Sequence, residues 1–375
     1  MLDEQISSEL ILFFILYGIT GVVPFLAAVY LLLRRGNAFA PNVTPPVRLR
    51  RWAAAFFAVS ALGHVWWYLF YTFSRDLQSA AYIAVVVLDC VALLTTIAGT
   101  LLSMLQDRKR PIWPAFVAMI PFVVLGVLQI LFPASSFINI AGIYILSLYV
   151  LFSVYMVFAV RQYGRWLNDN YADLENKKVW LTQVVSLFCL LLFILYALVD
   201  ADNILIYVLH ATELVLFALL LWRVETLPQL DSIAVEEACP APAQEQPQIS
   251  TLKPPISNLE QLLAEHCVDT RLYLQHDLTL QQLAQAIGTN RSYLSQYFSS
   301  QGITYNTYIN NLRINHFISL YQETATAGQP VVAQQLASES GYRSYSTFSL
   351  AFKQRVGQSV TAWMRNAGEA ENNYQ

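Results

Sequence analysis

Five polar side chains interrupt otherwise apolar stretches of this sequence and are the first candidates for chemistry. They are Ser60, His64, Asp89, His210 and Glu213. Ser60 and His64 are four residues apart and His210 and Glu213 are three apart, so each pair shares one face of a helix. Imidazole and carboxylate groups bind protons, ions and polar ligands, and they are costly to place inside a membrane. The set predicts an intramembrane polar or ligand-binding site.

The depth of these residues within their apolar segments suggests that some of them meet. At about 1.5 Å per helical residue, His64, Asp89 and Glu213 lie roughly 14 Å from the predicted outer ends of their segments. We therefore expect the three side chains to share a plane. Two interpretations stay open, a cavity that senses an unidentified signal ligand and a hydrogen-bonded network that only holds helices together.

A loose resemblance bears on the same residues. The order Ser60-x-x-x-His64, Asp89 and His210 resembles the motif layout of the seven-span alkaline ceramidase and adiponectin-receptor-like hydrolases. The resemblance implies a zinc site made of Ser-x-x-x-His, an Asp and a final His-x-x-x-His, but Leu214 stands where the last histidine would be. We predict no metal, no cofactor and no enzymatic activity. A zinc-hydrolase-like membrane enzyme with a regulatory DNA-binding tail is kept as the alternative.

Long apolar segments must position these side chains. The 375 residues are 56% hydrophobic and 13% charged, which lies outside the usual range of soluble chains. A bilayer core of about 30 Å requires about 20 apolar helical residues. Seven segments meet this length, at approximately 10–33, 52–73, 80–105, 112–132, 137–160, 179–199 and 203–222. The sequence therefore predicts a seven-transmembrane-helix bundle over residues 1–225.

Basic residues alternate between the connections and indicate an orientation. Arg75 is the single basic residue in one set of connections. The other set holds thirteen, namely Arg34, Arg35, Arg48, Arg50, Arg51, Arg108, Lys109, Arg110, Arg161, Arg165, Lys177, Lys178 and Arg223. The positive-inside rule then places the N-terminus outside and the C-terminus in the cytoplasm. We expect a multi-pass protein of the bacterial inner membrane, with the lipid bilayer as one partner.

The remaining two fifths of the sequence, residues 226–375, have the composition of a linker and a soluble domain. Residues 226–256 are rich in Pro, Gln and Ala and predict a flexible linker. In residues 257–375, the capping box Ser257-x-x-Glu260 predicts a first helix. Further helices are predicted at 280–287, 291–300, 305–322, 331–340 and 345–352, with candidate caps at Thr279, Asn290 and Ser344. Two helix pairs with glycine-containing turns, at Gly288 and Gly341, predict two helix-turn-helix motifs. The fold class is therefore all-α throughout.

The soluble domain also resembles a known family. Residues 257–365 resemble the DNA-binding domain of the AraC/XylS family. The matching stretches are Leu283-Ala284, Gly288 through Phe298, Gly302, Tyr308-Ile309, Leu312-Arg313, Leu336-Ala337, Ser340 through Phe348, Phe352-Lys353, Val356-Gly357 and Trp363-Met364-Arg365. Val360 departs from the family's usual proline, and Phe317 from its usual alanine. The resemblance implies that helices 291–300 and 345–352 enter adjacent major grooves of double-stranded promoter DNA.

The outward residues of these two helices are the candidate DNA contacts. Base edges would be read by Arg291, Ser292, Ser295, Gln296, Ser299, Tyr345, Ser346, Ser349 and Leu350. Phosphates would be contacted by Arg343, Lys353 and Arg355. Arg313 is counted with the basic residues that supply phosphate affinity.

The charge balance of residues 256–375 limits how tightly one domain can hold DNA. Seven basic residues stand against eight acidic ones. Because few counterions would be released, we expect weak binding by a single domain, strengthened in a homodimer or higher oligomer. RNA polymerase is a further candidate partner.

Overall fold

The computed structural model of the chain describes residues 8–34, 36–41, 43–74, 76, 79–198, 203–230 and 256–372. Within these ranges every regular element is a helix, and one isolated antiparallel bridge joins Tyr171 to Thr279. The predicted all-α fold class is confirmed. The chain divides into two compact units. The first comprises Met1–Tyr163 and Val179–Cys239, and the second comprises Gly164–Lys178 and Pro240–Gln375.

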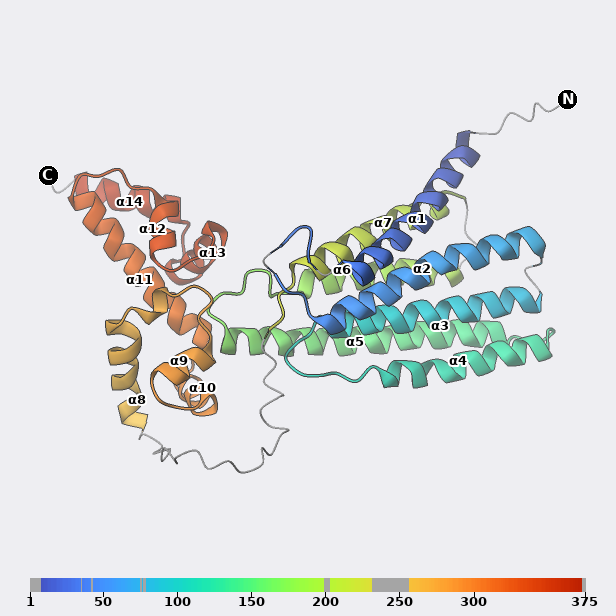
Figure 1. The fold of residues 1–375 in the computed structure, drawn as a ribbon, viewed down its shortest axis with the longest axis horizontal. Coiled ribbons are helices and arrows are strands. Elements are labelled where there is room, and N and C mark those ends of the chain that lie inside the picture. The colour runs from blue at the N-terminus through green and yellow to red at the C-terminus, as the bar shows by residue number, and fades with distance from the viewer. Residues whose placement is uncertain are drawn as a thin grey trace. The chain divides into compact units, whose positions relative to one another are not determined.

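The first unit is a bundle of long apolar helices (Figure 1). Its elements are α1 (Ser8–Leu33), α2 (Val47–Phe73), α3 (Ala80–Ser103), α4 (Trp113–Leu131), α5 (Phe137–Asn170), α6 (Trp180–Leu198) and α7 (Asn203–Thr226). Helix α1 packs on α2 and α7, α2 packs on α3, and α3 packs on α4. This arrangement brings together helices whose polar residues are far apart in the sequence.

Six of these helices are long and apolar enough to cross a membrane. They are α1 to α5 and α7, and the described apolar part of α6, Trp180–Leu195, is shorter. Large apolar side chains such as Phe14, Leu151 and Phe158 are more than half exposed. Exposed apolar surface of this extent is unusual for a soluble protein and is typical of a surface that faces lipid.

Small residues allow the helices of the first unit to approach closely. Gly99 of α3 lies against the ring of Trp52 on α2, where a methyl group would overlap the indole. Gly126 of α4 lies against the side chain of Val87 on α3 in the same way. Since lipid offers no hydrophobic drive for helix association, close packing of this kind contributes much of the stability of a membrane bundle.

The beginning of the predicted linker packs against the first unit. The backbone N–H of Gln229 donates to the Thr44 carbonyl at 2.8 Å, and that of Leu230 donates to the Gln106 side chain at 2.9 Å. The Gln106 amide in turn donates to the Pro228 carbonyl at 3.0 Å. Residues 227–230 therefore extend the first unit beyond α7. The rest of the predicted linker, 231–255, lies outside the described residues.

The second unit contains the helices of the C-terminal domain. They are α8 (Ile256–Leu263), the π-helical turn η2 (Ala264–Asp269), the 3₁₀ turn η3 (Leu272–Leu274), α9 (Leu280–Ala286), α10 (Arg291–Ser300), α11 (Tyr305–Thr326), α12 (Ala333–Glu339), α13 (Tyr345–Val356) and α14 (Val360–Asn372). Helices α9 and α10 form one helix-turn-helix unit, and α12 and α13 form the other. The long helix α11 connects them.

Local capping explains where these helices begin. Thr279 and Gln282 form a reciprocal capping box at α9, and the Asn290 side chain accepts from the Tyr293 N–H at the start of α10. The Ser344 hydroxyl accepts from the Thr347 N–H at the start of α13. Each cap satisfies a backbone donor that the helix itself cannot satisfy. These three sequence-predicted caps are confirmed, and the side chain of Ser257, a fourth predicted cap, lies outside the described residues.

Each helix-turn-helix unit has its own apolar core on α11. Ile309 belongs to the core of the first helix-turn-helix motif, α9 and α10, with Leu283, Leu294 and Phe298. Phe317 belongs to the core of the second helix-turn-helix motif, α12 and α13, and its ring centroid lies 4.4 Å from that of Phe348. Phe317 is fully buried, so its large side chain fills space within this core.

Arg313 on α11 is buried and cannot serve as a phosphate contact, so its assignment from the sequence to phosphate affinity is wrong. The residue is 1% exposed, and burial lowers the pKa of its guanidinium. Its Nε donates to the Tyr273 carbonyl at 2.7 Å, and one terminal nitrogen donates to the Gln275 carbonyl at 2.8 Å. The guanidinium also lies 5.4 Å from the ring centroid of Tyr342. Arg313 therefore joins the η3 turn to the second helix-turn-helix unit.

The Arg313→Lys variant is expected to lose about 1–3 kcal/mol of stability in the second unit, because an ammonium cannot reproduce the two directed bonds of the guanidinium. Hydrogen exchange of the full chain would report this as faster exchange of amides in η3 and α11. Unchanged exchange rates would show that the two carbonyl contacts contribute nothing to stability.

Candidate nucleic-acid interface

The first group of predicted base contacts lies on α10. Ser292, Gln296 and Ser299 are exposed, and Ser295 is half-buried beside them. Leu294 and Phe298 face the core on the opposite side. The helix therefore presents one polar face, as recognition helices require for contact with base edges.

The second group lies on α13. Ser346 is exposed, Leu350 is 54% exposed and Tyr345 is 36% exposed, whereas Phe348 and Phe352 are buried. An exposed leucine on a capped helix is suited to contact a thymine methyl group. Ser349 is half-buried on the same helix.

The predicted phosphate contacts surround α13. The Arg343 side chain is 63% exposed and pairs with Asp277 at 2.6 Å. Lys353 and Arg355 are exposed in the last turn of α13, and Arg355 donates to Asn315 at 2.9 Å. All three cations remain near the surface, where a phosphate can reach them.

The segment between α5 and α6, Gly164–Lys178, belongs to the same unit as these helices. We refer to it as the α5–α6 segment. Ala172 is 2% exposed and belongs to the core of the first helix-turn-helix unit. The Asn306 amide donates to the carbonyls of Tyr171 and Ala172 at 3.1 and 2.7 Å, and the Ala172 N–H donates to the Leu278 carbonyl at 3.3 Å. The segment is therefore built into the domain.

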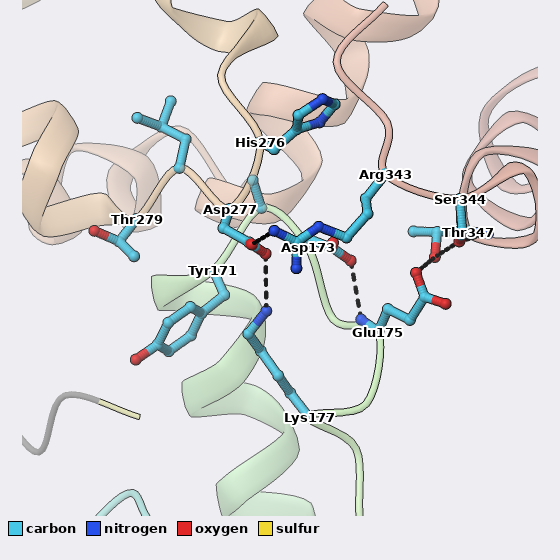
Figure 2. Close-up of polar contacts among 12 residues, drawn as sticks. Tyr171, Asp173, Glu175, Lys177, His276, Asp277, Thr279, Arg343, Ser344 and Thr347 are labelled. Carbon is cyan, nitrogen blue, oxygen red and sulfur yellow. Dashed lines mark hydrogen bonds and ion pairs between the residues drawn. The ribbon is translucent and has the colours of Figure 1, made fainter. Parts of the chain in front are cut away.

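Polar contacts connect the α5–α6 segment to candidate DNA contacts. Arg291 donates through Nε and a terminal nitrogen to the Asn170 side-chain oxygen, at 2.8 and 2.6 Å. The Thr347 hydroxyl in the first turn of α13 donates to the Glu175 carboxylate at 3.3 Å (Figure 2). The segment thus contacts the first turns of both recognition helices.

Asp277 forms ion pairs with two cations, one from the α5–α6 segment and one from the turn before α13. Lys177 of the α5–α6 segment approaches one carboxylate oxygen at 3.4 Å, and Arg343 approaches the other at 2.6 Å (Figure 2). Asp173 is buried nearby, and its carboxylate accepts from the Glu175 N–H at 2.9 Å. The carboxylates of Asp277 and Glu175 therefore lie beside Arg343 and Thr347 at the start of α13.

Sequence reasoning missed the residues of the α5–α6 segment. Lys177 was used only to orient the membrane helices, and Asn170, Asp173 and Glu175 were given no role. One signal was available, because the polar run from Asn168 to Asp173 continues directly from an apolar helix. Helix α5 is 34 residues long, well beyond the length that a bilayer requires.

Three of the predicted intramembrane residues form a cluster in the first unit, and Asp89 lies against Gly63, the residue before His64. His64, His210 and Glu213 lie together, with one ligand atom of each within 4.8 Å of the others. Asp89 instead accepts a hydrogen bond from the Trp67 indole at 3.3 Å. The Ser60 hydroxyl donates to the Phe56 carbonyl at 2.9 Å, so Ser60 contributes only its own carbonyl to His64.

A cavity of about 430 Å³ adjoins these residues within the first unit. Ser60 and Glu213 line it, together with mainly apolar side chains such as Phe122, Leu146 and Phe193. Its volume and lining are typical of sites that bind small apolar molecules carrying one polar group.

Two capped recognition helices on one connecting helix define the second unit as a double helix-turn-helix DNA-binding domain. Residues 283–366 match a family described as a helix-turn-helix domain, which is of the AraC/XylS type. No curated protein and no solved structure matches the chain. The family match agrees with the resemblance seen in the sequence and supports a DNA-binding transcription regulator.

Proposed function

We propose that the chain is a sequence-specific transcription regulator held in the inner membrane of a bacterium, and that its membrane helices pass a signal to the DNA-binding domain. Apolar helices of spanning length and a helix-turn-helix match in one chain support this proposal. In this arrangement the first unit receives the signal, and the second unit binds promoter DNA from the cytoplasmic side.

The observation that carries the proposal is the membership of the α5–α6 segment in the DNA-binding unit. Helix α5 begins in the first unit, and its last residues, through Asn170, belong to the second. The two units are therefore connected at both ends of this segment as well as through residues 231–255. A movement of α5 or α6 would act on the DNA-binding domain directly, without having to pass through the long linker.

The contacts of the segment suggest the direction of this control. The Asn170 side chain accepts two hydrogen bonds from Arg291, and the Glu175 carboxylate accepts one from Thr347 in the first turn of α13. DNA would have to replace the Asn170 contact for Arg291 to reach a base, and the Glu175 carboxylate would repel an approaching phosphate. We therefore assign low DNA affinity to the state with these contacts, and higher affinity to a state in which they are released.

Replacing Asn170 and Glu175 by alanine is expected to raise the affinity of the full chain for its DNA site about fivefold or more, a typical size for coupling between two states. Binding would be measured with the chain in lipid nanodiscs at fixed salt. Glu323→Ala is the matched control, because it removes an exposed carboxylate of α11. Equal or weaker binding by the double variant would show that the segment does not oppose DNA binding.

Genome-wide mapping of DNA crosslinked to the intact protein tests the regulator function itself. Discrete sites are expected, and they should weaken when Arg343 and Lys353 are replaced by alanine. An absence of discrete sites for the intact chain would contradict the proposed function.

A further inference from the structure

Helices α2 and α7 of the first unit bring three side chains that can bind a metal to one point, beside α1. His64 comes from α2, His210 and Glu213 come from α7, and Thr20 of α1 lies between them. The Thr20 hydroxyl oxygen is 2.9 Å from His64 Nε2 and 3.2 Å from His210 Nδ1. His210 Nδ1 is 3.4 Å from a carboxylate oxygen of Glu213. Two imidazole nitrogens thus flank a single hydroxyl, and a carboxylate oxygen lies beside one of them.

A backbone contact fixes the protonation of the His64 ring. Its Nδ1 lies 2.9 Å from the Ser60 carbonyl oxygen, which can only accept a hydrogen bond. Nδ1 therefore carries the proton, and in the neutral ring Nε2 presents a lone pair toward Thr20. Metal-binding histidines commonly use one ring nitrogen in this way, with the other donating to a carbonyl or carboxylate.

The Thr20 hydroxyl lies among more acceptors than it can serve. Its single hydroxyl hydrogen has four acceptors within reach, because the Leu16 and Tyr17 carbonyls also lie at 2.9 and 3.1 Å. It can serve only one of them. When His210 Nδ1 is unprotonated, it presents its lone pair toward the same point as His64 Nε2 and lies beside the Glu213 carboxylate, so a cation there would meet three ligand atoms.

We propose that His64 Nε2, His210 Nδ1 and the Glu213 carboxylate bind a divalent transition-metal ion, with zinc the best match to this ligand set. Two imidazoles and a carboxylate are an established zinc combination. Ligand atoms about 2.0–2.2 Å from zinc lie roughly 3.3 Å apart in a tetrahedron. The 3.4 Å between His210 and Glu213 already fits, and small side-chain rotations would bring the other pairs from within 4.8 Å to that spacing.

The surroundings of the cluster suit an ion held away from water. The Tyr17 ring centroid lies 4.9 Å from that of His64 and 6.0 Å from that of His210, and Phe13 lies 6.0 Å from His210. Gly21 of α1 faces the His64 ring and leaves room for it between α1 and α2. Glu213 also lines the 430 Å³ cavity, so the ion would lie beside a chamber that can admit an apolar ligand.

Metal content of the full chain tests this site. The chain would be purified in detergent with an affinity tag that lacks histidine, equilibrated with zinc and passed through a desalting column. We expect about one zinc per chain, and an at least tenfold lower content in His64→Ala and in Glu213→Gln. His266→Ala is the matched control, because His266 is exposed in η2, and it should retain the wild-type content.

Two further measurements keep the result decisive. Glu213→Gln preserves side-chain size, so normal gel-filtration behaviour with lost zinc supports the site even if His64→Ala misfolds. Cobalt in place of zinc should give the intense visible absorption of a tetrahedral site. A wild-type chain that retains no zinc, or variants that retain as much as the wild type, would overturn the proposal. Neither result would affect DNA binding by the second unit.

Discussion

Replacing Gly341 by alanine is expected to destabilise the second helix-turn-helix unit by about 2–5 kcal/mol, from about 1–2 for the left-handed backbone and about 1–3 for overpacking. Gly341 has a φ of +87° in the turn between α12 and α13. A Cβ at this position would lie 2.7 Å from the carbonyl oxygen of Leu274 and 2.8 Å from its Cα. Because these are backbone atoms, no side-chain rotation can relieve the overlap.

A second glycine of the same domain separates the two contributions. Gly357 follows α13 with a φ of +82°, but a Cβ at this position would have no neighbouring atom within 4 Å. Gly357→Ala should therefore cost only the conformational term of about 1–2 kcal/mol. Hydrogen exchange of α12 and α13 in the full chain would compare the two variants. Equal protection loss in both would show that contact with Leu274 is unimportant.

The Gly341 contact also has a consequence for the interface. Leu274 belongs to η3, close to the His276 ring nitrogen that donates to the Gly341 carbonyl at 3.1 Å. Asp277, which pairs with Arg343, is the next residue. A shift of this turn would move Arg343 relative to α13, so Gly341→Ala should weaken DNA binding even where the domain stays folded.

Features that depend on neighbouring residues could be predicted from the sequence. Thr279, Asn290 and Ser344 cap helices through contacts three residues away, and the glycine turns follow from the same local patterns. Apolar segments of spanning length are equally visible, because membrane thickness fixes their length. These signals were sufficient to predict the all-α fold and the positions of α10 and α13.

Features that depend on distant residues could not be predicted. Depth along a helix predicts that Asp89 lies in one plane with His64 and Glu213, and Asp89 does lie against Gly63, the residue before His64. Depth does not predict hydrogen-bond partners, however, and Asp89 accepts a hydrogen bond from Trp67. Ala172 carries no sign in the sequence that it enters the core of the DNA-binding unit. The burial of Arg313 was missed for a related reason, since counting charges assigns every cation to the surface.

Arg291 is the residue for which the sequence and the structure suggest different roles, and its replacement by alanine distinguishes them. If Arg291 reads a base once Asn170 releases it, Arg291→Ala should weaken binding to the specific site by about 1–3 kcal/mol and relax the preference at one base pair. If Arg291 only anchors the α5–α6 segment, the same variant should bind DNA as well as the wild type or better. Affinities for the mapped site and for single-base variants of it would separate these outcomes.

Lys353→Ala is the control that gives this comparison its meaning. Lys353 is an exposed cation in the last turn of α13, and its predicted contact is a phosphate. Its loss should weaken binding to all sequences alike and lower the slope of log affinity against log salt by about one. Arg291→Ala should change the ratio between specific and non-specific sites instead. If both variants changed only the salt slope, α10 would contact DNA without reading its sequence, and specificity would have to come from α13.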